Sequence, residues 1–217
     1  MPHANPTSYS ICVFCGARNG TRGDYTDFAE QLGKELARQG VGLVYGGSER
    51  GLMGSLARAT LDAGGHVIGI IPADLVEKEK AAGASTELYV VSNMHQRKSL
   101  MYRLAAGFVA LPGGFGTMDE LLEIATWAKL GLHSKPIALA NVGGYFDPLV
   151  NWFDRAVQDG FVDPAERQLV RTLDTVDEVL DHLQPARIVG KPPQANWSVW
   201  KAGAGEHAIR RQAGSQV

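Results

Sequence analysis

Two glycine-rich segments of the chain have the composition of anion-binding turns. The first runs from Gly46 to Gly54, and the second runs from Pro112 to Glu120. Glycines let backbone N–H groups approach an anion closely, and a helix that begins in such a turn adds the positive end of its dipole. A phosphate group is therefore the ligand that both segments favour.

Neither segment matches the phosphate-binding patterns of the common nucleotide-binding classes. The dinucleotide fingerprint G-x-G-x-x-G belongs after the first strand of a βαβ unit, where the sequence Gly16-Ala17-Arg18-Asn19-Gly20 does not fit it. The pattern G-x-x-x-x-G-K-[ST] does not occur in the chain. These observations leave a mononucleotide or a sugar phosphate as the ligand.

The carboxylate of Glu120 follows the second turn and has two interpretations. Thr117 and Glu120 fit the S/T-x-x-E capping box, in which they would only close the start of a helix. Alternatively, Glu120 belongs to a polar stripe with Glu123 and Thr126 along one side of that helix. The buried face would then be formed by Leu121, Leu122, Ile124 and Ala125. A carboxylate above a phosphate site suits chemistry on a ribose 5′-phosphate, because it can steady an oxocarbenium-like C1′ or orient water towards it.

Arg97 and Lys98 stand near the start of another predicted helix. Adjacent basic residues are usually a solvated surface. Cations at this end of a helix oppose its dipole, however, and a local conflict of this kind is typical of functional residues. The planar guanidinium of Arg97 could clamp a phosphate or a leaving group.

Short apolar runs alternate with longer amphipathic segments along the whole chain. The apolar runs predict strands at 9–15, 41–45, 66–71, 87–91, 107–111, 136–140 and 168–173. The amphipathic segments predict a first helix that Asp24 caps and Gly40 ends, and later helices at 51–63, 74–81, 93–105, 117–130, 148–159 and 175–183. Continuous apolar strands indicate burial on both faces and parallel pairing. The pattern predicts a doubly wound α/β sheet, which binds ligands at the carboxyl ends of its strands.

Length and composition bound the class of protein. The chain has 217 residues with a net charge of −2, which favours one domain and no general attraction to nucleic acid or anionic membranes. No apolar run approaches the ~18 residues that span a bilayer, and the first ten residues lack a signal-peptide pattern. We therefore expect a cytoplasmic protein. The expected organisation is a flexible N-terminus at 1–8, one nucleotide-binding catalytic domain at 9–184, and a loosely structured tail at 185–217 whose Trp197 and Trp200 could alternatively dock on a neighbouring subunit.

Cys12 and Cys15 form a C-x-x-C pattern inside an apolar strand. A redox pair needs its first thiol at a helix N-terminus, and positions three apart in a strand point to opposite faces. The sequence therefore favours two buried, separate thiols over a redox pair. Neither a metal-ligand spacing nor a disulfide scaffold is present.

Three motifs together resemble one known family. They are Tyr45-Gly46-Gly47 with Gly51-Leu52-Met53-Gly54, Met94-His95-Gln96-Arg97-Lys98, and Pro112-Gly113-Gly114-x-Gly116-Thr117-x-x-Glu120. The combination resembles the Lonely Guy (LOG) family of cytokinin riboside 5′-monophosphate phosphoribohydrolases, which are often mislabelled lysine decarboxylases. The resemblance covers about residues 9–183 and excludes the tail.

The resemblance implies a fold, an assembly and an activity. The fold would be a single Rossmann-like doubly wound domain with a mostly parallel sheet flanked by helices, assembled as a homodimer or a multiple of dimers. The reaction would be hydrolysis of the N-glycosidic bond of AMP or N6-modified AMP to free base and ribose 5-phosphate, without a cofactor or metal. Arg97 and Glu120 would be the catalytic pair. The substrate-binding residues would be Gly46, Gly47, Glu79, Lys98, Gly113, Gly114, Phe115, Gly116, Thr117, Met118, Asp119 and Thr126.

This chain departs from the family pattern at two places, and its sequence bears on two other activities. Ser48 stands where a third glycine is usual, and Ala17-Arg18 stands where small hydroxyl residues are common, so substrate preference is open. A pyridoxal phosphate decarboxylase is disfavoured because Lys98 is the one lysine near a phosphate turn and it adjoins Arg97. The alternative function is a protein that binds a nucleotide or a phosphorylated cofactor without cleaving it, which would not need Arg97 and Glu120.

Overall fold

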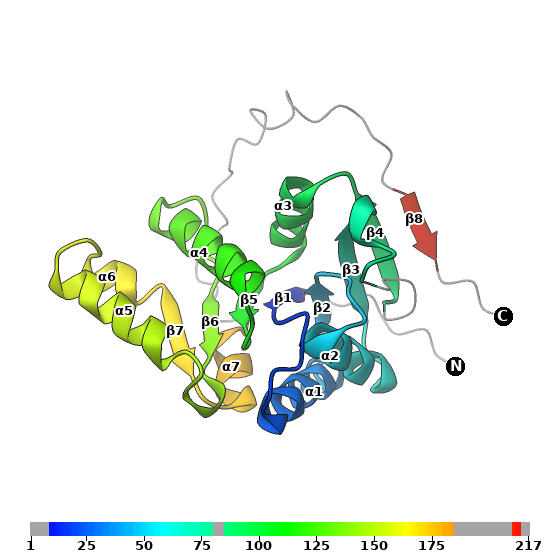
Figure 1. Cartoon of the computed structure of the whole chain (residues 1–217), viewed down its shortest axis with the longest axis horizontal. Coiled ribbons are helices and arrows are strands. Elements are labelled where there is room, and N and C mark those ends of the chain that lie inside the picture. Colours follow the sequence, from blue (N-terminus) through cyan, green and yellow to red (C-terminus); the bar gives the residue numbers. More distant parts are fainter. Residues whose placement is uncertain (1–8, 80–84, 185–209, 214–217) are drawn as a thin grey trace.

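The fold is a doubly wound α/β sheet, as the alternating pattern predicts. A computed structural model describes residues 9–79, 85–184 and 210–213. The sheet has the strand order β7-β6-β5-β1-β2-β3-β4-β8, and β1 to β7 pair in parallel (Figure 1). Its strands are β1 Ser10–Phe14, β2 Gly42–Tyr45, β3 Val67–Pro72, β4 Glu87–Val91, β5 Gly107–Ala110, β6 Ile137–Ala140, β7 Val170–Leu173 and β8 Arg210–Ala213.

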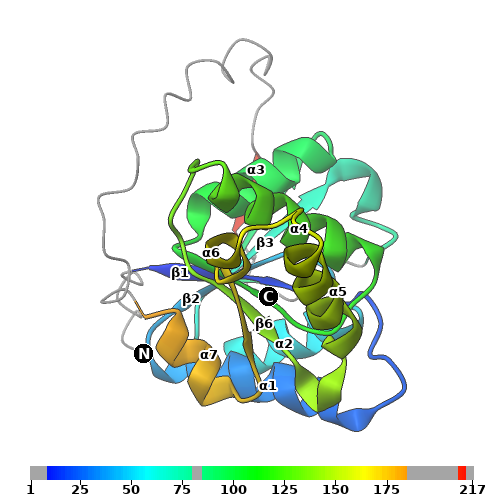
Figure 2. The same cartoon turned by 90° about the vertical axis from the view of Figure 1, so that its left-hand side faces the viewer.

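The helices cover both faces of the sheet (Figure 2). Apolar residues of α1 (Gly23–Arg38), α2 (Gly51–Asp62) and α7 (Val176–His182) form one core cluster with one face of the strands. Residues of α3 (Met94–Leu104), α4 (Phe115–Lys129) and α5 (Asp147–Gln158) form another cluster with the opposite face. A short helix, α6 (Pro164–Arg167), leads into β7. The strands are thus buried on both sides, which explains their continuous apolar sequences.

Cys12 and Cys15 lie on opposite faces of the sheet, because each belongs to a different one of these two core clusters. Both are free and buried. Burial raises the pKa of the Cys15 thiol well above its usual range. The prediction of two separate, buried thiols is confirmed.

Three local predictions are corrected. Asp24 does not cap α1, because the helix begins at Gly23 and Asp24 instead accepts a hydrogen bond of 3.1 Å from Nε of Arg22. The helix expected at 74–81 is a 3₁₀ helix at Ala73–Leu75 followed by turns up to residue 79, and residues 80 and 81 lie outside the described part. The helix expected at 117–130 begins two residues earlier, at Phe115, which matters for the site below.

The C-terminal segment is described only at residues 210–213. These residues form β8, which pairs antiparallel with β4 at the edge of the sheet. Trp197 and Trp200 lie outside the described residues. In the described part of the chain, no helix has the length and apolar character needed to cross a membrane.

Candidate active site

A cavity of about 470 Å³ lies at the carboxyl ends of β1, β2 and β5. The strand order reverses between β1 and β5, because β2 follows on one side of β1 and β5 lies on the other. The crevice at such a switch point is the usual ligand site of doubly wound sheets. The volume is in the range of pockets that hold small ligands.

The turn between β5 and α4 forms one wall of the cavity. Pro112, Gly113, Gly114, Gly116 and Thr117 line it. α4 begins at Phe115 with Gly114 at the N-cap, and no side chain of the described residues caps it. A methyl group added at Gly114 or Gly116 would meet no atom within 4 Å among the described residues. The first backbone N–H groups of α4 therefore stand beside open space, as a bound anion requires.

Contacts from two other loops hold this turn in place. Oη of Tyr145 donates a hydrogen bond of 2.5 Å to the carbonyl oxygen of Gly113. The ring of Tyr145 packs edge-on against Tyr25, at 5.6 Å between centroids. N–H of Gly16, just after β1, donates to the carbonyl oxygen of Pro112 at 3.0 Å. The turn is consequently fixed before any ligand arrives.

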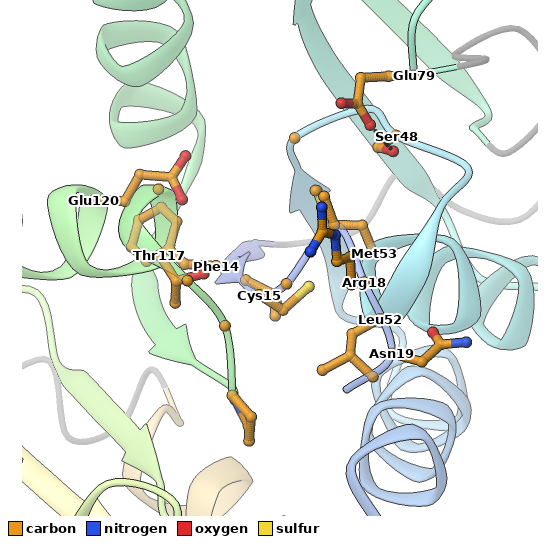
Figure 3. A pocket seen from close by; sticks show the side chains of 18 of the residues that line it. Phe14, Cys15, Arg18, Asn19, Ser48, Leu52, Met53, Glu79, Thr117 and Glu120 are labelled. Carbon is orange, nitrogen blue, oxygen red and sulfur yellow. Dashed lines mark hydrogen bonds between the residues drawn. The ribbon is translucent and has the colours of Figure 1, made fainter. Parts of the chain in front are cut away.

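Glu120 lies on α4 behind this turn and lines the cavity (Figure 3). Because α4 begins at Phe115, Thr117 is in the first helical turn rather than at the N-cap. The capping-box interpretation of Thr117 and Glu120 is therefore wrong. Only 9% of Glu120 is exposed, and within the described chain its carboxylate makes no hydrogen bond or ion pair. A buried carboxylate that faces a cavity is available to a ligand.

Burial raises the pKa of the Glu120 carboxyl to about 7. The charge of Arg97 opposes this shift, and the neighbouring carboxylate of Asp119 adds to it. A group with a pKa near neutral pH can accept and return a proton under ordinary conditions. The environment of Glu120 therefore suits a general acid or base.

Arg97 reaches the cavity from α3 and is held by two backbone carbonyls. Its Nε donates to the carbonyl oxygen of Ile70 at 3.1 Å, and its Nη2 donates to that of Gly46 at 3.0 Å. The side chain is partly buried and lines the cavity. The solvated-surface interpretation is wrong for Arg97, whose guanidinium is oriented by Gly46, just after β2, and by Ile70 of β3.

Glu79 and Ser48 meet on the far side of the cavity, and Figure 3 shows them together. Oγ of the buried Ser48 donates to Oε2 of Glu79 at 2.6 Å, and the backbone N–H of Glu49 donates to the carbonyl oxygen of Glu79 at 3.2 Å. Gly46 also lines the cavity. Ser48, which replaces the usual third glycine, thus orients the carboxylate of Glu79.

Several predicted substrate-binding residues do not line this cavity. The side chain of Phe115 is 97% exposed, and Met118 packs against the core cluster of α3, α4 and α5. Thr126 donates to the carbonyl oxygen of Leu122 at 2.7 Å, and Leu122 itself is exposed rather than buried as predicted. The others outside the cavity lining are Gly47, Lys98 and Asp119. These residues are near the motifs in sequence, but they lie outside the lining of this cavity.

Other lining residues were not predicted. Arg18 and Asn19 project from the loop after β1 (Figure 3), while Met94 comes from α3 and Tyr145 from the loop after β6. The rule that ligands sit at the carboxyl ends of parallel strands could have indicated Arg18, Asn19 and Tyr145. Of these three, only Arg18 was marked by a local pattern, as part of the Ala17-Arg18 departure from the family sequence.

The fold and the site together define a Rossmann-type α/β protein with a phosphate-type turn and a buried carboxylate in one cavity. The family described as "Possible lysine decarboxylase" matches residues 53–183 of this chain. Curated relatives from plants match at 41% to 47% identity. The chain belongs to the LOG family.

Three such relatives illustrate the similarity. The probable cytokinin riboside 5′-monophosphate phosphoribohydrolase LOGL3 of Oryza sativa subsp. japonica is 47% identical over 80% of this chain and 82% of its own length. The probable phosphoribohydrolase LOGL2 of the same plant is 41% identical over 95% of this chain and 90% of its own. The cytokinin riboside 5′-monophosphate phosphoribohydrolase LOG3 of Arabidopsis thaliana is 45% identical over 80% of this chain and 81% of its own length.

Solved structures share the fold at lower identity. The molybdenum cofactor carrier protein of Chlamydomonas reinhardtii superposes with a TM-score of 0.61 at 24% identity, over 80% of this chain and 94% of its own. The molybdenum cofactor binding protein of Rippkaea orientalis superposes with a TM-score of 0.59 at 18% identity, over 80% of this chain and 94% of its own. These likenesses establish the Rossmann-like fold and nothing about the ligand of this chain.

Proposed function

We propose that this protein hydrolyses the N-glycosidic bond of adenosine 5′-monophosphate, with or without an N6 substituent, to free base and ribose 5-phosphate. The names of its relatives support this class of substrate and reaction. The observation that carries the proposal is the position of Glu120, which is buried, faces the cavity, and lies one to two helical turns beyond an open glycine turn.

The 5′-phosphate binds at the start of α4. Gly113, Gly114, Gly116 and Thr117 line the cavity there, and the helix has no acidic residue in its first turn. Backbone N–H groups and the positive end of the helix dipole hold the dianion. This contact fixes the ribose beside Glu120.

The chemistry then falls to Glu120 and Arg97. The carboxylate of Glu120 stabilises the positive charge that develops at C1′ and takes a proton from the attacking water. The bond from C1′ to the purine nitrogen breaks, its electron pair leaves with the base, and the water oxygen bonds to C1′. Arg97, which is held by Gly46 and Ile70, stabilises the negative charge on the departing base. The base then takes up a proton from solvent and Glu120 releases its own, which completes the hydrolysis.

Glu79 takes part in binding the base. Its carboxylate is held by Ser48 and lines the cavity opposite the phosphate turn. An amino group at C6 of the purine keeps at least one N–H when it carries one substituent, so a carboxylate acceptor tolerates both AMP and N6-modified AMP.

The assembly proposed is a homodimer or a multiple of dimers in the cytoplasm. Phe115 and Leu122 of α4 are exposed, as is Leu130 at its C-cap, and exposed apolar side chains grouped along one helix are typical of subunit contacts. The free thiols of Cys12 and Cys15 fit a reducing compartment. Sedimentation at several protein concentrations tests the assembly, and a monomer at all of them would contradict it.

A product assay tests the proposed reaction. The protein is incubated with AMP, with N6-isopentenyl-AMP and with adenosine, and the free base is measured by chromatography. We expect base from at least one nucleotide and little from adenosine, because the nucleoside lacks the phosphate. No base from either nucleotide at any pH from five to nine would overturn the proposal. A thermal shift with AMP and no product would instead favour the binding protein without catalysis.

A further inference from the structure

Lys98 makes contacts that a substrate ligand would not need. Its Nζ lies 3.1 Å from Oδ2 of Asp119 and 3.2 Å from Oε1 of Glu123. Only 14% of the Lys98 side chain is exposed. The ammonium group is therefore occupied by two carboxylates of α4 and does not line the main cavity.

Those two carboxylates flank Glu120 on α4. Asp119 precedes Glu120 directly, and Glu123 follows it by three residues, on the neighbouring turn. Three acidic side chains thus lie within five residues of one helix. Glu123 is three residues from Glu120 and four from Asp119, and like charges at these two spacings disfavour ionisation and helix formation. Lys98 bridges the outer two and leaves the middle one unpaired.

These charged groups also line a second, much smaller crevice. Lys98, Glu120 and Glu123 all line it, together with the rings of Phe14, Tyr102, Phe108 and Trp127. Aromatic surroundings exclude water and so lengthen the reach of each charge. The electrostatic interactions of Glu120 with Lys98 and Glu123 are therefore only weakly screened by water.

We propose that Lys98 is a positioning residue that neutralises Asp119 and Glu123 and so lets Glu120 ionise at neutral pH. This inference rests on the proposed function only in treating Glu120 as the acid–base group. The charged or titratable groups around Glu120 are Arg97 and Lys98 from α3, Asp119 and Glu123 from α4, and the thiols of Cys12 and Cys15 from β1. The two thiols stay neutral, since burial raises the pKa of each.

The directions of the individual influences agree with this role. Arg97 and Lys98 lower the pKa of Glu120, whereas Asp119 and Glu123 raise it, and burial is the largest cause of the raised value. Loss of Lys98 would remove a positive charge that lowers the pKa of Glu120. It would also leave the carboxylates of Asp119 and Glu123, which raise that pKa, without their partner. The pKa of Glu120 should then rise further.

The first experiment compares Lys98→Met with the unaltered protein. We expect the acidic limb of the pH profile of kcat/KM to move to higher pH by about one unit, the low end of the effect of a nearby charge. Lys98→Arg should keep the original midpoint because it keeps the charge. Lys129→Met is the matched control, since it breaks an ion pair between α4 and Glu166 away from the cavity and should leave the midpoint unchanged.

A charge-compensated variant separates this role from substrate binding. Combining Lys98→Met with Asp119→Asn and Glu123→Gln removes the cation and both anions together, so the midpoint should return to the original pH or below it. The double variant Asp119→Asn with Glu123→Gln, which keeps Lys98, should lower the midpoint. If Lys98→Met does not fold, this double variant alone tests the proposal. A raised KM in Lys98→Met with an unmoved midpoint would overturn the proposal and make Lys98 a substrate ligand.

A titration without substrate keeps this inference distinct from the proposed function. Carboxyl carbons are followed by ¹³C NMR in the free protein, and the Glu120 signal is assigned from its loss in Glu120→Gln. The midpoint of Glu120 should rise in Lys98→Met even if no nucleotide is cleaved. An identical midpoint in both proteins would refute the inference whether or not the enzyme is active.

Discussion

The turn between β2 and α2 is packed against other parts of the protein, whereas the turn between β5 and α4 opens on empty space at Gly114 and Gly116, although Gly113 at its start is packed against Thr117 and Gly16. A methyl group at Gly46 would collide with the guanidinium of Arg97, and one at Gly51 would collide with the backbone of Ala17 and Arg18. At Gly114 and Gly116 the same group would meet nothing within 4 Å among the described residues.

The two turns therefore use glycine for different reasons. In the packed turn, the missing side chain lets protein groups approach one another, and Arg97 is held in place as a result. In the open turn, the missing side chains of Gly114 and Gly116 leave room for a ligand beside backbone N–H groups. Similar glycine-rich sequences can therefore serve either to position a catalytic group or to admit a substrate. Four substitutions test this difference between the two turns, beginning with Glu120 behind the open turn.

Glu120→Gln should have the largest effect. Turnover should fall at least ~100-fold, because a positioned acid–base group is lost. The pKa of Glu120 is about 7 in the folded protein against an ordinary value of 4.5, so the folded state binds the proton more tightly. The unaltered protein therefore loses stability as pH rises from 4.5 to 7, by up to about 3 kcal/mol, and the glutamine variant does not.

Urea unfolding of both proteins at pH 5 and pH 8 measures this difference, alongside the product assay. The variant should gain stability relative to the unaltered protein between the two pH values. A variant that kept full activity and lost stability would return Glu120 to a purely structural role.

Gly46→Ala should have the next largest effect and tests the packed turn. The added methyl group displaces Arg97, so we expect a loss of kcat of about tenfold to a hundredfold, with about 1–3 kcal/mol of destabilisation from overpacking. Steady-state kinetics and thermal unfolding measure both. Gly23→Ala is the control, because a methyl group there meets none of the described residues within 4 Å and Gly23 does not line the cavity. Unchanged kcat in Gly46→Ala would show that Arg97 need not be held as it is.

Gly116→Ala tests the open turn and should act in the opposite way on stability. Nothing in the described protein obstructs the methyl group, and alanine favours the helix, so unfolding should cost up to about 1 kcal/mol more. The KM for the nucleotide should rise about tenfold because the methyl group crowds the phosphate. Binding measured by calorimetry with AMP and with adenosine would locate the effect. Equal weakening for both ligands would contradict a phosphate at this turn.

Tyr145→Phe should have the smallest effect, because it removes one hydrogen bond that holds the carbonyl of Gly113. One such bond contributes about 0.5–1.5 kcal/mol, so KM should rise about twofold to tenfold while kcat stays nearly unchanged. Tyr9→Phe is the control, because Tyr9 lies just before the start of β1, at the end of the sheet away from the cavity. A fall in kcat without a change in KM would place Tyr145 in the chemistry instead.

Much of the fold could be predicted because its signals are local. Strands such as Ile137–Ala140 are continuous apolar runs, and burial on both faces is the one arrangement that satisfies them. The separation of Cys12 and Cys15 followed from the two-residue period of a strand. Helix starts were harder, because Thr117 and Glu120 match a capping box in sequence while the helix begins at Phe115.

Sequence alone determined the α/β class, the glycine turns and the choice of Arg97 and Glu120 as candidates, because residue type and spacing carry that information within one element. The partners of these residues came only from tertiary structure. Lys98 meets Glu123 across two helices, Tyr145 meets the turn at Gly113, and Ser48 meets Glu79. Such contacts join segments that are far apart in the chain, so they depend on how the sheet and its helices pack. The same packing determines which charged groups lie close enough to Glu120 to shift its pKa.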